Sequence, residues 1–127
     1  MPHPWSHGIF YWNELMTRNA ERDKKFYADT LGWTFDAMAM ENGTYWVAKM
    51  GDKTIGGLLD ISAPQFGPVP ERWMAYIAVD DVDARIAKAV KAGAKVMKPA
   101  FEIPGVGRTA ILLEPGGAAI GWITPAS

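Results

Sequence analysis

The sequence contains no cysteine and only two histidines, His3 and His7. The chain therefore forms no disulfide and has neither a thiolate nucleophile nor sulfur ligands for zinc. The formal net charge is −1, and lysine and arginine are spread along the sequence. This distribution lacks the basic patch that nucleic acid or an anionic membrane surface requires, so we expect neither of them as a partner.

Long hydrophobic runs are also absent. No apolar segment approaches the about 20 residues that cross a bilayer. The opening MPHPWSHGIF lacks the basic and apolar regions of a signal peptide, which predicts a cytoplasmic protein. Phosphate-binding GxxxxGK loops, dinucleotide fingerprints and nucleophile elbows are missing, and the glycines of GVGR and EPGG are typical of tight turns between strands.

Large apolar side chains are abundant. The 127 residues include six Trp, five Phe, four Tyr and seven Met, and their length predicts a single domain over 1–127. Such side chains serve either a well-packed core or an aromatic-lined pocket, and composition leaves both open.

The first half of the chain begins with a predicted strand and helix. Its predicted elements are a strand over 7–16, a helix over 19–32, and strands over 33–40, 44–50 and 54–61. Asn19 is a suitable N-cap and Gly32 a suitable stop for the helix, whose apolar positions are Phe26, Tyr27 and Leu31.

The second half repeats this order after a proline-rich linker over 62–71. Its predicted elements are a strand over 72–79, a helix over 80–94, and strands over 95–102, 108–114 and 118–124. Corresponding elements are about 62 residues apart, which indicates an internal β-α-β-β-β repeat. The fold class is therefore α+β, with one module over about 7–61 and a second over about 72–124. Neither module can bury its sheet face alone, so the two must pack together.

This repeat, with FY…LGW closing the first helix and VDDVDA…AGA in the second half, resembles the glyoxalase/bleomycin-resistance/dioxygenase superfamily, also called vicinal oxygen chelate proteins. The opening WNELMT is similar to that of a glyoxalase-like subgroup. The resemblance implies two modules that form a half-open, sheet-walled cup. Its members include lyases, isomerases, epimerases, ring-cleaving dioxygenases and drug-binding proteins, so the fold alone does not choose among these functions.

The resemblance also implies where a metal ion would bind. Members that bind a divalent metal use His, Gln or Glu side chains early in each module and in the final strand. The corresponding residues here are Trp12, Met74 and Gly121, none of which supplies a ligand for zinc, nickel, manganese or iron. We therefore expect no metal and no cofactor.

Alternation along the strands predicts the residues that line the cup. The predicted ligand-binding residues are Phe10, Trp12, Glu14, Met74, Tyr76 and Gly121. The alternate residues, Ile9, Tyr11, Leu15, Ala75, Ile77 and Val79, should face the helices and form the core. Gln65 and Arg108 are possible further polar groups from loops, whereas Trp33, Trp46 and Trp122 are better explained by packing.

Glu14 is the residue on which the functional hypotheses differ. A carboxylate among aromatic side chains is costly to desolvate unless it has a partner. It is an anchor for a cationic ligand, a general base, a metal ligand displaced from the usual position and assisted by His7 and Glu114, or simply a hydrogen-bonding partner of Tyr76. The sequence alone leaves these roles open.

The leading prediction is a metal-independent, small-molecule-binding protein with Glu14 as its polar anchor. The alternative is an enzyme of lyase, isomerase or dioxygenase type that uses Glu14 as base or as a non-standard metal ligand. A third hypothesis is an assembly module whose cup is filled by its own side chains. Exposed sheet edges favour a homodimer in each case.

Overall fold

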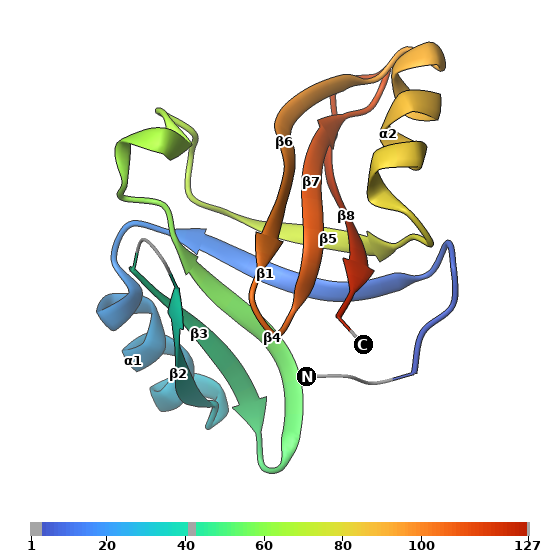
Figure 1. Cartoon of the computed structure of the whole chain (residues 1–127). Helices are drawn as coiled ribbons and strands as arrows, with labels where there is room; N and C mark the ends of the chain where they lie inside the picture. The colour runs from blue at the N-terminus through green and yellow to red at the C-terminus, as the bar shows by residue number, and fades with distance from the viewer. Residues whose placement is uncertain (1–3, 41–42, 127) are drawn as a thin grey trace. The chain divides into compact units, whose positions relative to one another are not determined.

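The computed structural model describes residues 4–40 and 43–126. Two β-α-β-β-β runs follow one another along the chain, joined by the short 3-10 helix η1 (Figure 1). The elements are β1 (Phe10–Thr17), α1 (Ala20–Leu31), β2 (Thr34–Met40), β3 (Gly43–Met50), β4 (Lys53–Asp60), η1 (Pro64–Phe66), β5 (Arg72–Ala78), α2 (Val82–Lys91), β6 (Lys95–Ile103), β7 (Gly107–Leu113) and β8 (Ala119–Pro125). The predicted α+β class and the repeat are confirmed.

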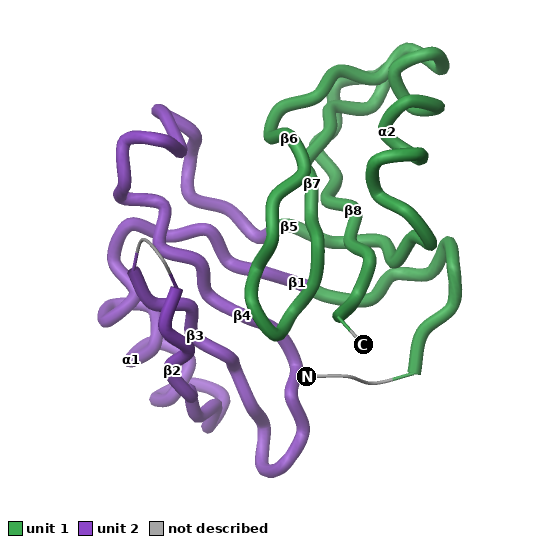
Figure 2. Tube along the Cα trace, in the orientation of Figure 1, with its two compact units in different colours: residues 1–12, 74–127 green, residues 13–73 purple. Residues whose placement is uncertain are grey.

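The chain divides into two compact units (Figure 2). Unit 1 consists of Met1–Trp12 and Met74–Ser127, and unit 2 of Asn13–Trp73, so β1 contributes residues to both. The module bounds and the cup expected from the sequence remain predictions.

Unit 2 contains the strand order β2-β3-β4-β1. β1 runs parallel to β4, and in their register Glu14 is opposite Gly57. Helix α1 contacts β2 and β4. It begins where the Asn19 side chain accepts a hydrogen bond from the Arg22 backbone, and it ends at Gly32, whose φ of 77° is the left-handed conformation that glycine adopts most easily.

Helix α1 differs from the prediction in how its apolar face is used. Within Ala20–Leu31 no residue is buried, and Phe26 and Leu31 are 56% and 51% exposed. Tyr27 instead stacks on Trp33 at 4.6 Å between ring centroids and accepts a hydrogen bond from the Trp73 indole nitrogen at 3.1 Å. The apolar positions of this helix thus serve a partly exposed aromatic cluster and not a closed core.

Unit 1 contains the corresponding order β5-β8-β7-β6, with β5 parallel to β8. Helix α2 contacts β6, β7 and β8 (Figure 1), and the Asp81 carboxylate caps it by accepting a hydrogen bond from Ala84 N at 3.1 Å. Its core joins Val79, Val82 and Ala110, with Ile77 and Trp122 packed against them. Ile77 and Val79 therefore face this helix, as predicted.

No helix in the described part of the chain is long and apolar enough to cross a membrane.

Candidate functional site

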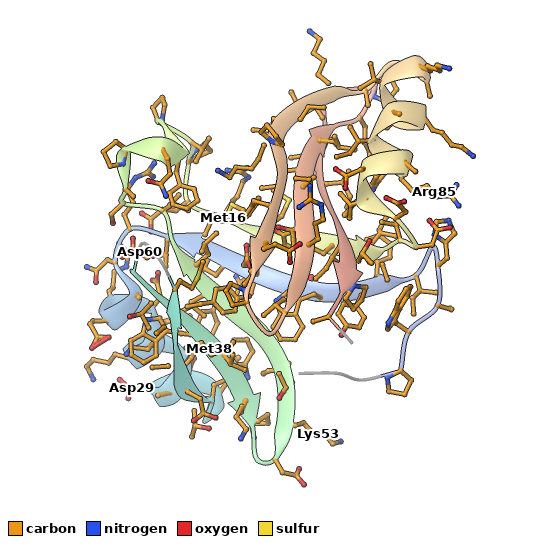
Figure 3. All side chains as sticks on the ribbon, in the orientation of Figure 1. Met16, Asp29, Met38, Lys53, Asp60 and Arg85 are labelled. Carbon is orange, nitrogen blue, oxygen red and sulfur yellow. The ribbon has the colours of Figure 1, made fainter. Side chains whose placement is uncertain are left out.

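The buried carboxyl group of Glu14 lies on the central part of β1. Its exposed fraction is 0%, and it alternates with Trp12 and Met16, each 3% exposed, whereas Asn13 between them is exposed. Met16 is labelled in Figure 3. The side chains of this face are therefore apolar around a single carboxyl group, an arrangement that needs a polar partner to be stable.

Gly57 on β4 leaves space opposite Glu14 that a tyrosine occupies. The Tyr45 ring lies so close over Gly57 that any side chain there would clash with it. The neighbouring Gly56 is equally restricted, because a Cβ atom would lie 2.8 Å from the Asn13 carbonyl oxygen. The sequence reading did not assign Tyr45 or Gly57 to the site, although a glycine pair inside a strand signals close approach of another group.

Unit 1 repeats this arrangement on β5 and β8. Tyr76 is opposite Gly121 in the strand register, and its ring occupies the space that a Cβ atom of residue 121 would need. Tyr76 and Met74 are 1% and 2% exposed. Glu14 with Gly57 and Tyr76 with Gly121 are thus equivalent pairs of the two runs, and in each a tyrosine ring covers a glycine.

The Tyr76–Gly121 packing bears on the metal site that the sequence resemblance implies. A carboxylate at residue 121 requires room that the Tyr76 ring fills. Trp12 and Met74, the other two positions, are buried side chains without a hard or borderline donor atom. The residues present do not fit that metal site.

The alternative set of metal ligands weighed from the sequence does not form a cluster either. Within residues 4–40 and 43–126, no group of three His, Cys, Asp or Glu side chains is placed to hold a metal ion, and this includes His7, Glu14 and Glu114. His7 Nδ1 instead accepts a hydrogen bond from Asp80 N at 3.1 Å, a role at the entry to the strand. Glu114 is exposed in the turn between β7 and β8.

The proposed additional polar groups have other contacts. Arg108 belongs to β7 and not to a loop, and it donates to both oxygens of Asp83 at 2.9 and 3.2 Å. This hydrogen bonding lowers the pKa of Asp83 and raises the pKa of Arg108. Gln65 lies in η1 and is exposed. The guanidinium group of Arg108 is therefore committed to a structural ion pair.

The other aromatic side chains considered from the sequence are either exposed to solvent or packed against neighbouring side chains. Phe10, expected in the cup, is 71% exposed. Trp46 lies under the Lys24 ammonium, 3.2 Å from its ring centroid, and Trp33 belongs to the aromatic cluster with Tyr27. Packing is thus the observed role of both tryptophans.

The chain contains two β-α-β-β-β runs, and in each run the first and last strands are parallel. This repeated arrangement defines the class of α+β protein to which the chain belongs. The chain belongs to the Glyoxalase/Bleomycin resistance protein/Dioxygenase superfamily, whose model matches residues 9–121. It is similar to "Putative glyoxylase CFP32" of Mycobacterium bovis, with 40% identity over 94% of this chain and 45% of that protein. The chain thus spans about half the length of the curated relatives it matches.

More distant similarities extend over most of the chain. "Anthracycline biosynthesis protein DnrV" of Streptomyces peucetius is 28% identical over 85% of this chain and 44% of that protein. A Streptomyces coelicolor methylmalonyl-CoA epimerase variant in complex with 2-nitronate-propionyl-CoA has a TM-score of 0.68, 17% identity and coverage of 96% of this chain and 100% of that chain. At this identity the structural likeness establishes the shared fold.

Proposed function

We propose that the chain is a cytoplasmic small-molecule-binding protein of this superfamily that works without a metal ion. The observation that carries the proposal is the Tyr76 ring packed against Gly121, where a metal-binding carboxylate would need space. The buried side chains of Trp12 and Met74 support the same reading. The proposed binding residues are Phe10, Trp12, Glu14, Met74, Tyr76 and Gly121.

The chemistry of these side chains suggests the class of ligand. Apolar and aromatic groups with a few polar atoms are typical of small-molecule sites. Glu14 is fully buried, so its carboxylate would attract a cationic group strongly in a medium of low dielectric constant. Aromatic rings nearby add attraction for the same cation. We therefore propose an aromatic or apolar ligand that carries a positive charge.

A catalytic role for Glu14 is the second candidate function. It is supported by the similarity to a protein named as a glyoxylase and by the fold shared with an epimerase. A carboxylate within hydrogen-bond reach of the proton to be removed is a suitable general base. If the chain is an enzyme of this kind, Glu14 abstracts a proton from the bound substrate.

A homodimer is part of the proposal. β2 and β6 stand at the outer ends of the strand orders of their units, and such edges are commonly covered by a partner. Light scattering on the purified chain measures the mass directly.

A ligand screen with metal analysis tests the proposed function. Untagged protein purified without chelator should contain no stoichiometric zinc, nickel, manganese or iron, and should bind cationic aromatic probes. E14Q should weaken binding of the cationic probes at least tenfold and leave neutral analogues of the same shape within about twofold.

The outcome separates the two candidate functions. If Glu14 is a base, E14Q abolishes turnover of a substrate and leaves its affinity nearly unchanged. Stoichiometric metal that disappears in the E14A variant would contradict the metal-independent proposal.

A further inference from the structure

A depression lies on the helix-covered face of unit 1, where α2 packs against the strands. One pocket of about 420 Å³ and one of about 180 Å³ share Ala89, Ala92 and Trp122 in their linings, so they lie next to each other and together make up a groove beside α2. We call it the α2 groove. It is separate from the proposed binding residues, because Ile77 and Trp122 are paired in the β5–β8 register and alternate with Tyr76 and Gly121.

The groove results from small residues near the end of α2 that lie above a large residue on β8. Val82 and Ile86 fill the space between α2 and the strands at the start of the helix. Further along, Ala89 and Ala92 project only methyl groups and leave the half-buried Trp122 incompletely covered. The floor is therefore an aromatic surface with apolar walls, where a hydrocarbon chain gains by leaving water.

Two cationic side chains line the larger pocket, and one of them is paired with a carboxylate that lies outside the lining. Its lining includes Arg85 and Lys88 but no carboxylate side chain (Arg85 is labelled in Figure 3). Arg85 already donates to both oxygens of Asp80 at 2.8 and 3.0 Å, which positions its guanidinium group. Lys88 has no ion-pair partner among the described residues, so its ammonium group is available to an anion at this end.

The other end of the groove is different. The smaller pocket is lined by apolar groups, among them Ala94, Leu112 and Ile120, with Glu114 and Pro115 from the turn that precedes β8. A negative head group is disfavoured next to Glu114 and favoured next to Lys88. The polarity of the groove therefore fixes the direction in which an amphipathic anion lies.

We propose that the α2 groove binds a medium-chain carboxylate. The carboxylate pairs with Lys88, and the hydrocarbon chain lies over Trp122 between Ala89 and Ala92, with its end in the smaller pocket. This site takes an anion on the helix-covered face, whereas the proposed function concerns a cationic ligand and residues of the alternate strand face. The two proposals are independent.

Calorimetric titration of the full chain with decanoate, decanol and decyltrimethylammonium, each below its micelle concentration, tests the assignment. Decanoate should bind with one-to-one stoichiometry, decanol about tenfold more weakly, and the cation more weakly still. Octanoate and dodecanoate should bracket decanoate, with affinity changing roughly two- to fourfold per methylene group in a groove that leaves part of the chain in water.

Variants of α2 provide matched controls. A89L fills the groove with a good helix former and should weaken decanoate binding at least tenfold, with the helical circular dichroism unchanged. K88Q should weaken decanoate about fivefold or more and leave decanol unchanged. A87L and K91Q make the same chemical changes at exposed positions of α2 outside both linings and should bind decanoate as the unmodified chain does.

Several results would overturn the proposal. Equal affinity for decanoate and decyltrimethylammonium would remove the role of Lys88, and unchanged binding in A89L would place the hydrocarbon chain elsewhere. Loss of decanoate binding in E14Q would assign the anion to the other strand face. Absence of binding combined with a change of molecular mass in A89L would show that the groove is an interface between copies of the chain.

Discussion

At the scale of single residues, Gly121 shows how the absence of a side chain on one strand makes room for a ring from the neighbouring strand. From the sequence, the resemblance to the superfamily implies a metal-binding carboxylate at the position of this glycine. In the structure the space beside this glycine is occupied by the Tyr76 ring, and the equivalent Gly57 admits the Tyr45 ring. The absence of a Cβ atom at each glycine therefore allows a tyrosine ring to pack directly against the backbone of the strand.

The G121A substitution should destabilise the fold. The added methyl group must displace the Tyr76 ring, and overpacking of this kind typically costs about 1–3 kcal/mol. Urea unfolding followed by fluorescence measures the change. G116A is the matched control, because nothing lies within 4 Å of its added methyl group, and its effect should stay within about 0.5 kcal/mol. Equal effects of the two substitutions would contradict the packing described for Tyr76.

At the scale of elements, α1 depends on polar contacts at its start more than on a buried face. The Thr17 hydroxyl donates to Asp23 and lies 2.9 Å from Glu71 Oε1, to which Arg22 also donates at 2.6 Å. These contacts connect the end of β1, the first turn of α1 and the residue that precedes β5. Since no residue of Ala20–Leu31 is buried, such contacts and the N-cap hold this helix in place.

Substitution of the N-cap residue Asn19 should therefore destabilise the whole of α1. Asn19 Oδ1 accepts a hydrogen bond from Arg22 N at 3.0 Å, and N19A should reduce the free energy of unfolding by about 1 kcal/mol. N19S restores a capping oxygen and should recover most of that loss. Urea midpoints of the three proteins, with helical circular dichroism as the probe, measure the effect. An N19S variant as unstable as N19A would show that capping is not the cause.

At the scale of the whole molecule, three arginine–carboxylate pairs make the free energy of unfolding depend on pH in the acidic range. Hydrogen bonds from Arg22, Arg85 and Arg108 lower the pKa values of Glu71, Asp80 and Asp83 respectively, that of Asp80 to about 2. A carboxyl group with a lower pKa in the folded state stabilises the fold at every pH above its unfolded value. That contribution disappears as the pH falls through the folded value.

Stability should accordingly be lost between about pH 4.5 and pH 2, and not near neutrality. Urea midpoints at pH 7, 4.5, 3 and 2 follow the loss. The double variant D80N/R85Q should show a shallower decline between pH 4 and pH 2 than the unmodified chain, because the Asp80 contribution is already absent. High salt should reduce the difference between the two proteins, since these pairs are exposed and screened. An identical pH profile for the two proteins would contradict a contribution from this pair.

The sequence predicted the burial of some residues of the candidate site but not of others. The alternation along β1 predicts that Trp12, Glu14 and Met16 share a face, and all three are buried while Asn13 is exposed. The same rule could not predict that Phe10, on the same face, is 71% exposed at the start of the strand. Ligand binding by Trp12, Glu14 and the other proposed binding residues is a proposal that the ligand screen tests.

By itself, the sequence determined the repeated β-α-β-β-β order, the α+β class and the helix ends, because period, caps and turn residues act between neighbours along the chain. The tertiary structure decided what fills the space beside Gly57 and Gly121, the partners of Arg108, and the opening above Trp122 under α2. These features depend on which side chains of distant strands and helices meet and how much volume they leave. Periodicity specifies the face of each residue but not the shape of what lies against it.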